Sequence, residues 1–508
     1  MQIEKIKTFG ELKKSGYQSL TIKQELRKNL ITKLKSGDKF FDGIHGFEHT
    51  VIPDLERAIL SRHNMILLGL RGQAKTKIAR LLTTLLDEYI PVVEGSDLND
   101  DPFAPISVYA INKLEAEGDN TPISWMHRDA RYTEKLATPD VSVADLIGDV
   151  DPIKAANLKL NYNDERVIHF GLIPRSHRCI FVINELPDLQ ARIQVALFNI
   201  LQEGDIQIRG FKIRLPLDIQ FVFTANPEDY TNRGSIVTPL KDRIESQILT
   251  HYPKSLENAL EITEQEARVS DEQKDTVKVS DLIKRLIEQV SFEARNSELV
   301  DKKSGVSARL TISAFENAVS AAERRAIMNN ENLTQVWMSD LVGIIPSITG
   351  KVELVYEGEQ EGPYQVAMNL VDKAIRSQFS QYFPNPDTIK KKRTSGKPSP
   401  EGKEEENIFR SITSWFDKGN SLNLSFNTSD KEKILLLYKV DGLNSLVKKY
   451  FPKTNEEQAA LLMEFVLHGL ASYSLISKKI FENKIEFKDL MDSMMNFSEK
   501  DFEFDEDA

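Results

Sequence analysis

Residues 69–76 have the residue types and spacing that suit phosphate binding. They read Gly-Leu-Arg-Gly-Gln-Ala-Lys-Thr and directly follow the apolar run Met65–Leu68, which predicts a strand, a glycine-bearing loop and then a helix. Backbone N–H groups of such a loop point toward phosphate oxygens, and the start of the helix adds a favourable dipole. The ammonium of Lys75 can then reach the β- and γ-phosphates of a nucleotide, and the hydroxyl of Thr76 is available to Mg²⁺.

The loop departs at one position from the pattern G-x-x-x-x-G-K-[ST], because Ala74 stands where the second glycine belongs. Gly69 and Gly72 still allow the backbone to approach a phosphate closely. A strand–turn–helix unit without a ligand is the alternative interpretation, and the motifs further along the chain weigh against it. We expect six residues of the loop to contact the nucleotide: Gly69, Gly72, Gln73, Ala74, Lys75 and Thr76.

Two later apolar runs, typical of strands buried on both faces of a parallel sheet, are followed by polar residues. Ile180–Ile183 precedes Asn184 and Glu185, and Ile219–Phe223 precedes Asn226 by a short interval. Ligands of open α/β sheets bind at the carboxyl ends of the strands. There Glu185 can orient and deprotonate an attacking water, and the amide of Asn226 can bridge that water and the γ-phosphate.

Asn184 occupies the position at which phosphate-loop ATPases usually carry an aspartate that helps to hold Mg²⁺. Its amide can hydrogen-bond to a metal-bound water, but it brings no charge. We therefore expect Asn184 to act on the ion through water, while Thr76 binds it directly. The alternative, that Asn184 and Glu185 merely end a strand, is disfavoured by the phosphate loop upstream.

Two arginines follow in the same order along the chain. Arg243 begins the segment that leads into a further apolar strand, Ser246–Leu249, and Arg309 stands at the entrance to a predicted helix, Ile312–Met328. Either arginine alone would most often be a solvated surface residue. Their order and spacing fit an arginine finger at Arg243 and a second-sensor arginine at Arg309.

This order of motifs resembles that of AAA+ ATPases, and most specifically the ATPase subunit of magnesium chelatase and the related MoxR-type ATPases. The resemblance extends over about residues 35–345. Besides the motifs above, it is carried by five stretches: 92–95, 100–105, 144–151, 170–178 and 202–215.

The resemblance implies an α/β fold with an AAA+ P-loop parallel sheet core and a helical lid, to which this chain adds a mainly helical C-terminal domain. It implies a ring, usually a hexamer, with ATP and Mg²⁺ bound between subunits. Arg243 would reach the nucleotide of the neighbouring subunit, and Arg175 and Arg178 would flank the same interface. A protein with a von Willebrand factor A domain is the implied partner, and remodelling of that partner or of an unidentified client protein is the implied work.

Two other functions stay open. In an assembly scaffold, Ala74 and Asn184 would have slowed or abolished hydrolysis, but Glu185 argues against this because a scaffold needs no catalytic base. A nucleic-acid-acting relative is disfavoured by the net charge of −11, although the predicted hairpin within residues 205–215 carries Arg209, Lys212 and Arg214. Within the motor class, the altered positions and the added C-terminal residues favour a chelatase-like chaperone over a porphyrin chelatase.

The composition fits an ordinary globular protein, with 508 residues, 40% hydrophobic and 28% charged. No apolar run is long enough to span a bilayer, and the first residues lack a secretory signal pattern, so we expect a cytoplasmic protein. The single cysteine, Cys179, excludes an internal disulfide framework and is expected to be a small core residue.

Composition shifts and helical periodicity divide the chain into six expected segments. These are an N-terminal helical arm (1–34), the ATPase core (35–255, with an insertion at 95–165 that decorates it), a helical lid and extension (256–383), a flexible linker (384–407), a helical C-terminal domain (408–497) and an acidic tail (498–508).

Overall fold

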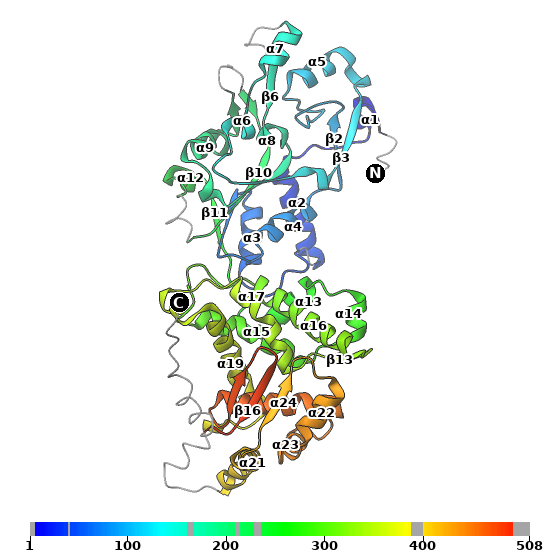
Figure 1. The fold of residues 1–508 in the computed structure, drawn as a ribbon. Coiled ribbons are helices and arrows are strands. Elements are labelled where there is room, and N and C mark those ends of the chain that lie inside the picture. Colours follow the sequence, from blue (N-terminus) through cyan, green and yellow to red (C-terminus); the bar gives the residue numbers. More distant parts are fainter. Residues whose placement is uncertain are drawn as a thin grey trace. The chain divides into compact units, whose positions relative to one another are not determined.

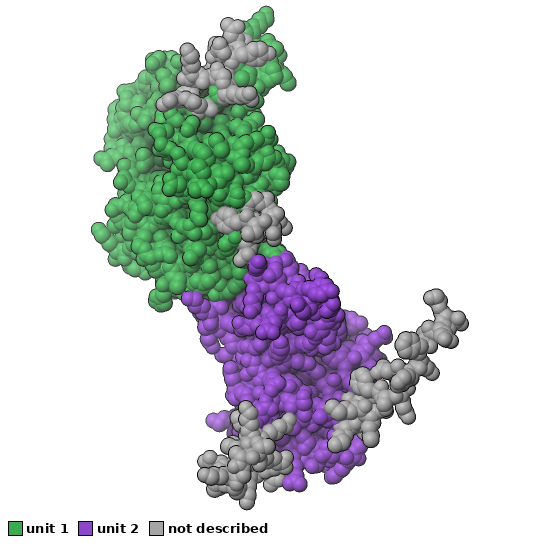
Figure 2. Space-filling view, turned by 90° about the vertical axis from the view of Figure 1, so that its left-hand side faces the viewer, with its two compact units in different colours: residues 1–252 green, residues 253–508 purple. Residues whose placement is uncertain are grey.

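A computed structural model of the chain describes residues 6–38, 41–159, 167–208, 214–227, 235–387 and 400–490. It divides into two compact units, residues 1–252 and 253–508, which Figure 2 shows in green and purple. The division lies three residues from the boundary expected between the ATPase core and the lid. The acidic tail and the basic part of the expected linker lie outside the described residues.

Unit 1 is built on a five-stranded sheet in the order β11-β1-β10-β7-β4, and all four neighbouring pairs are parallel. The α/β parallel core predicted from the sequence is therefore confirmed. The strands are β1 (Met65–Leu68), β4 (Tyr132–Leu136), β7 (Cys179–Asn184), β10 (Ile219–Ala225) and β11 (Ser246–Leu249).

Hydrophobic residues cover both faces of this sheet, because successive side chains of each central strand enter different clusters. Met65 and Leu67 pack with helices α2 (Ile22–Ser36), α3 (Val51–Leu60) and α4 (Lys75–Leu81). Ile66 and Leu68 pack on the other face with α9 (Ala191–Ala196) and α10 (Phe198–Glu203). Burial on both faces explains the uninterrupted apolar runs of these strands. Figure 1 shows α2, α3 and α4 grouped in blue beside the sheet.

The remaining elements of unit 1 are helices and two-stranded antiparallel pairs. Its helices are α1 (Phe9–Lys14), α2 (Ile22–Ser36), α3 (Val51–Leu60), α4 (Lys75–Leu81), α5 (Val108–Glu117), α6 (Val143–Leu146), α7 (Pro152–Leu158), α8 (Leu172–Arg175), α9 (Ala191–Ala196), α10 (Phe198–Glu203) and α12 (Thr238–Asp242). Three antiparallel pairs complete it: β2 (Tyr89–Val93) with β3 (Ile123–His127), β5 (Gly148–Val150) with β6 (Ile168–Phe170), and β8 (Asp205–Gln207) with β9 (Arg214–Pro216). The last pair is the predicted hairpin, and its Arg209 and Lys212 lie outside the described residues.

The expected N-terminal arm is instead part of the core of unit 1. Three apolar residues of α2 are buried among the side chains beneath the sheet. Glu25 of the same helix forms a two-pronged ion pair with Arg131, with both N···O distances at 2.7 Å and both side chains buried. A charge pair of this kind is stable in the interior only when it is fully hydrogen-bonded, so it ties α2 firmly to the chain before β4.

The segment expected as an insertion, 95–165, contributes a strand to the central sheet. β4 pairs in parallel with β7, with Leu136 opposite Asn184. The prediction that the whole segment decorates the core is wrong for this part. β4 has a mixed, partly exposed sequence because it lies at the edge of the sheet, so it lacks the apolar run that marks the central strands.

Unit 2 is mainly helical, as expected. Its helices are α13 (Leu256–Glu266), α14 (Asp271–Thr276), α15 (Asp281–Asn296), α16 (Arg309–Asn329), α17 (Ile345–Thr349), α18 (Tyr356–Glu361), α19 (Pro363–Tyr382), α21 (Pro400–Asp417), α22 (Asp430–Tyr438), α23 (Leu443–Tyr450) and α24 (Glu456–Ser472). It also contains a short parallel pair, β12 (Val277–Lys278) and β13 (Thr334–Gln335), and an antiparallel sheet of β14 (Leu422–Ser425), β16 (Lys484–Lys488) and β15 (Ser477–Ile480).

The segments expected as a lid and as a C-terminal domain share one hydrophobic core, so the expected separate C-terminal domain is not observed. A single cluster runs from Val277 to Phe487. Buried charges join the same parts: Arg325 of α16 bonds to Asp340 at 3.0 Å and to Asp430 at the start of α22. The expected linker is also shorter, because α21 begins at Pro400, and proline is favoured at the first position of a helix.

One buried carboxyl of this core predicts a pH-dependent stability. Burial raises the pKa of Glu288 on α15 to about 7, against the hydrogen bond from the Thr263 hydroxyl, which lowers it. The folded state thus keeps a proton that the unfolded chain releases above its ordinary pKa. The stabilisation is complete below about pH 4.5 and is lost as the pH rises to 7, an effect on the order of 3 kcal/mol.

We therefore expect Glu288→Gln to reduce the loss of unfolding free energy between pH 5 and pH 8, measured by denaturant titration. The buried His468 of the same unit has a lowered pKa, from burial, and contributes a pH dependence of opposite sign. The contribution of His468 is the same in the wild type and in the variant, so it cancels when their pH dependences are compared. An identical pH dependence of the variant and the wild type would contradict the assignment to Glu288.

Among the described helices, none combines the length and the apolar character needed to cross a membrane.

Candidate functional site

Three neighbouring strands bring several of the predicted residues together at their carboxyl ends. Leu68 of β1 lies opposite Ala225 of β10, so Gly69, which begins the loop, and Asn226 follow directly on neighbouring strand ends. The backbone N–H of Gly69 donates to the Ala225 carbonyl at 3.2 Å. On the other side of β10, β7 ends at Asn184. Neighbouring strands are about 4.8 Å apart, so the three ends lie within about 10 Å.

The start of the loop is packed so closely that only glycine fits. A Cβ on Gly69 would lie 1.9 Å from Oγ1 of Thr250 and 2.1 Å from Oε1 of Gln73. These two side chains are hydrogen-bonded to each other at 2.7 Å. Gln73, which the sequence placed among the phosphate contacts, is therefore buried as a support of the loop, and Thr250 is a support that the sequence did not indicate.

The middle of the loop has the backbone shape of an anion-binding nest. Gly72 has φ +72° and Ala74 has φ +57°, both in the left-handed region. Left-handed residues within a turn direct successive N–H groups to one side, where they can hold phosphate oxygens. Ala74 thus has a left-handed conformation that glycine adopts without strain, at a cost of roughly 1–2 kcal/mol for a residue with a Cβ.

We expect Ala74→Gly to stabilise the folded protein by up to about 1 kcal/mol, because relief of the left-handed strain exceeds the added flexibility of the unfolded chain. Gly72→Ala is the matched control in the same loop and should destabilise by a similar amount. Chemical denaturation of the wild type and the two variants gives both values. A loss of stability in Ala74→Gly would contradict the backbone assignment.

Lys75 is buried at the end of the loop, and its ammonium points back into it. The ammonium donates to the carbonyl of Leu70 at 3.0 Å and to that of Gly69. Thr76 follows it in the first turn of α4 and is partly exposed. The lysine and the threonine hydroxyl thus lie directly after the nest, as the sequence pattern predicts.

Asn184 is held by hydrogen bonds at both ends of its amide. Oδ1 accepts from the Thr224 hydroxyl at 3.1 Å, and Nδ2 donates to Oε1 of Glu134 on β4. Glu134 was not identified from the sequence, because it lies in the segment interpreted as an insertion. The available signal was indirect: an asparagine in place of an aspartate suggests that a neighbouring residue carries the missing carboxylate.

Glu185 follows Asn184 in a strained conformation, with φ +53° and ψ +53°. Its backbone N–H donates to Oγ1 of Thr224 at 3.1 Å. Non-glycine residues in this region are uncommon and cluster at functional sites, where the surroundings hold them in place. The strain turns the chain sharply at the end of β7, and one hydroxyl of β10 links the backbone of Glu185 to the amide of Asn184.

Arg243 lies at the opposite end of the sheet from the loop at residues 69–76 of its own chain. It follows α12 and precedes β11, whose first residue Ser246 is paired with Met65 at the amino end of β1. Its guanidinium donates to Oε1 of Gln202 at 2.8 Å and stacks 5.1 Å from the ring centre of Phe198. Arg243 is thus presented by α10 on the surface of unit 1, away from the loop that precedes its own α4.

The other predicted arginines differ in their surroundings. Arg309 is exposed as the first residue of α16 in unit 2, and its role as a second sensor stays a prediction. Arg178 is buried, and it donates to the Pro91 carbonyl at 2.7 Å. The expectation that Arg178 flanks a subunit interface is therefore wrong, since it supports the core, whereas Arg175 is exposed.

Cys179 is buried as expected, and burial raises its pKa to about 12.

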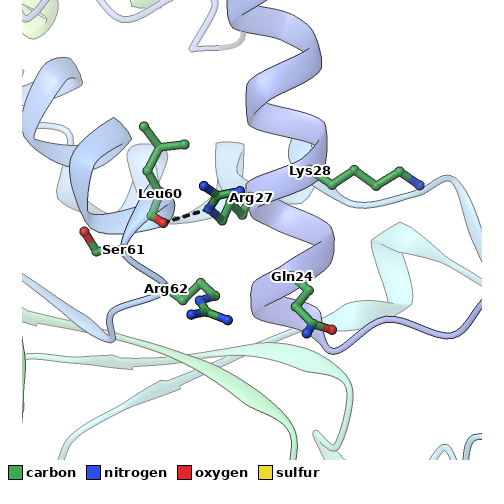
Figure 3. A pocket seen from close by; sticks show the side chains of 6 residues that line it. All are labelled: Gln24, Arg27, Lys28, Leu60, Ser61 and Arg62. Carbon is green, nitrogen blue, oxygen red and sulfur yellow. Dashed lines mark hydrogen bonds between the residues drawn. The ribbon is translucent and has the colours of Figure 1, made fainter.

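A hollow of about 410 Å³ between α2 and the end of α3 is separate from this site (Figure 3). Arg27, Lys28 and Arg62 line it, and Nε of Arg27 donates to the Leu60 carbonyl at 3.0 Å. This bond satisfies a carbonyl at the carboxyl end of α3, a common use of arginine. The hollow lies before the amino end of β1, and so takes no part in the site at the carboxyl ends.

The residues at the carboxyl ends of these strands have the chemistry needed to bind a nucleotide with Mg²⁺. The nest and the buried ammonium of Lys75 supply donors for phosphate oxygens, and the hydroxyl of Thr76 and the amide of Asn184 supply oxygens that suit a hard cation. Carboxylates of Glu185 and Glu134 border the same strand ends. This donor set combines phosphate recognition with one candidate base.

No protein-family model matches this chain. A presumptive ATPase from Cytophaga hutchinsonii aligns with 71% of this chain and 97% of its own length, at 18% identity and a TM-score of 0.28. A structure of the complex between subunits BchI and BchD of magnesium chelatase aligns with 63% of this chain and 98% of that one, at 19% identity and a TM-score of 0.34. The alignment with Hsp104 spans 61% of this chain and about half of that chain, at 49%, with 12% identity and a TM-score of 0.36. At values this low, any function has to be inferred from the site itself.

Proposed function

We propose that this chain is an AAA+ ATPase of the magnesium-chelatase and MoxR type, which binds ATP with Mg²⁺ at the carboxyl edge of its sheet and hydrolyses it. The observation that carries the proposal is the meeting of the phosphate loop, Asn226 and Glu185 at the ends of three adjacent parallel strands. The resemblance of the motif order supports the specific type.

Each residue has a role that follows from its chemistry. The nest around Gly72 and the ammonium of Lys75 hold the phosphates, and Thr76 and Asn184 serve Mg²⁺, directly and through water. Mg²⁺, when bound, neutralises charge on the phosphate oxygens. Glu185 orients water and takes its proton, and Asn226 fixes the position of that water against the γ-phosphate.

Arg243 completes the site of a neighbouring copy. It lies at the end of the sheet away from its own loop, where Gln202 and Phe198 hold its guanidinium, so a second copy is the natural acceptor of its charge. If each copy donates Arg243 to the next copy, the copies assemble into a ring. Hydrolysis in mixtures of variants tests this arrangement. Arg309 would report on the nucleotide from the lid.

We further propose that hydrolysis remodels a partner or client protein, with a von Willebrand factor A domain protein as the first candidate partner. The resemblance supports this step. The alternative function is an ATP-dependent scaffold with little or no hydrolysis, and the uncharged Asn184 favours it. The two functions are distinguished by whether the protein hydrolyses ATP and whether replacement of Glu185 abolishes this hydrolysis.

Nucleotide binding tests the proposal first. Lys75→Ala removes the buried ammonium, and we expect it to lose detectable binding of ATP with Mg²⁺ in isothermal titration calorimetry. Lys77→Ala on the same helix is the matched control, because it removes one positive charge outside the loop. Equal ATP affinity in Lys75→Ala and the wild type would contradict the phosphate-loop assignment.

A further inference from the structure

The orientation of the Asn184 amide is determined by its neighbours. Thr224 donates to Oδ1 through a hydroxyl that also accepts from the N–H of Glu185, so that hydroxyl proton is committed to Asn184. On the other side, Oε1 of Glu134 can only accept while ionised, so it requires the Nδ2 end of the amide. Reversal of the amide would place two acceptors against each other.

This contact explains why position 184 is an asparagine. An aspartate there would place its carboxylate against that of Glu134, and two carboxylates in contact repel strongly unless one takes up a proton. The pair Asn184 and Glu134 therefore behaves as a unit with one negative charge, located on β4 instead of β7. Glu134 reaches Asn184 diagonally, because Leu136, two residues further along β4, is the residue directly opposite Asn184.

Glu134 is also connected to the helix that follows the phosphate loop. Its Oε2 accepts from Nε of Arg80 on α4 at 3.0 Å, from the terminal nitrogen at 2.9 Å and from the Tyr132 hydroxyl at 3.1 Å. The Arg80 side chain is 64% exposed and that of Glu134 only 23%, so solvent screens the guanidinium charge more than the carboxylate charge. Arg80 and Tyr132 thus bond to Oε2 of Glu134, and the other oxygen, Oε1, accepts from the amide of Asn184.

We propose that Glu134 is a positioning residue for the metal-bound nucleotide and supplies the negative charge that an aspartate at position 184 would otherwise supply. It acts through Asn184: Oε1 of Glu134 accepts a hydrogen bond from the amide N–H and polarises the amide, which would make Oδ1 a better acceptor for a water ligand of Mg²⁺. This inference rests on the proposed function and adds to it the residue that sets the Mg²⁺ requirement.

The test measures the Mg²⁺ concentration needed for half-maximal binding of the fluorescent nucleotide mant-ATP. We expect Glu134→Gln to raise it by about 10- to 100-fold, the usual effect of losing a group that orients a metal ligand, with little change in binding without Mg²⁺. Asn184→Asp alone should bring no improvement, because its carboxylate faces Glu134. The double variant Glu134→Gln/Asn184→Asp returns one carboxylate to the site and should recover most of the loss.

Arg80→Gln is the control for a purely structural connection, because it breaks the ion pair but keeps the carboxylate. It should leave the Mg²⁺ requirement unchanged or lower it. Three results would overturn the inference: a Mg²⁺ requirement of Glu134→Gln equal to that of the wild type, an equal rise of this requirement in Arg80→Gln, or no recovery in the double variant. In each case, Mg²⁺-dependent binding of mant-ATP by the wild type would leave the proposed function standing. A wild type that binds no mant-ATP with or without Mg²⁺ would overturn the proposed function, and this inference with it.

Discussion

Replacement of Arg243 by alanine should lower steady-state ATP hydrolysis by about 10³-fold or more, the usual cost of a missing arginine finger. The reason is electrostatic: negative charge develops on the phosphoryl oxygens during transfer, and a guanidinium in a site shielded from water stabilises it strongly. Gln202 and Phe198 hold this guanidinium on the surface of unit 1. ATP binding by each separate copy should change little, because Arg243 lies away from its own loop.

Lys241→Ala is the control for Arg243, since it removes an exposed positive charge from α12. Its hydrolysis rate should stay near that of the wild type. Equal losses in both variants would show a general effect of surface charge, and an unchanged rate in Arg243→Ala would remove the arginine from the site.

Replacement of Glu185 by glutamine should lower hydrolysis by about 10²- to 10⁴-fold, the usual contribution of a general base, while ATP still binds. Glutamine has the same shape but cannot accept a proton from water. The left-handed turn at this residue should persist, because Thr224 bonds to its backbone and not to its carboxylate. Hydrolysis and ATP affinity are measured on the same preparation.

Asp188→Asn, in the turn after Glu185, is the matched acid-to-amide control and should retain turnover. Hydrolysis at the wild-type rate in Glu185→Gln would reject the base assignment. Absence of turnover in the wild type itself, with ATP bound, would favour the scaffold over the motor.

The centre of the site could be predicted from the sequence because buried parallel strands leave a strong signal. The apolar runs before Gly69, Asn184 and Asn226 can be buried on both faces only as neighbouring central strands, and this places their polar ends together. In unit 2, the helix predicted at Ile312–Met328 is confirmed by α16 (Arg309–Asn329), because its buried residues recur at helical spacing.

The edge strand β4 and the single shared core of unit 2 could not be predicted in this way. β4 has the mixed composition of an edge strand, so Glu134 stayed hidden although it contacts Asn184. The shared core of unit 2 depends on pairings between residues far apart in sequence, such as Arg325 with Asp430 and Lys433 with Ser339. Local periodicity contains no information on such pairings. The burial of Arg178 was missed for the same reason, since its partner, the Pro91 carbonyl, is an ordinary backbone group.

The most direct test of hydrolysis at a site shared by two copies is the turnover of a mixture of Glu185→Gln and Arg243→Ala proteins. Each variant lacks one group, but an Arg243→Ala copy keeps its base and can receive the arginine of an adjacent Glu185→Gln copy. We predict that the mixture hydrolyses ATP well above the sum of the separate variants. A mixture no more active than that sum, while each variant still binds ATP and the wild type turns over, would contradict a site completed by Arg243 from a neighbouring copy.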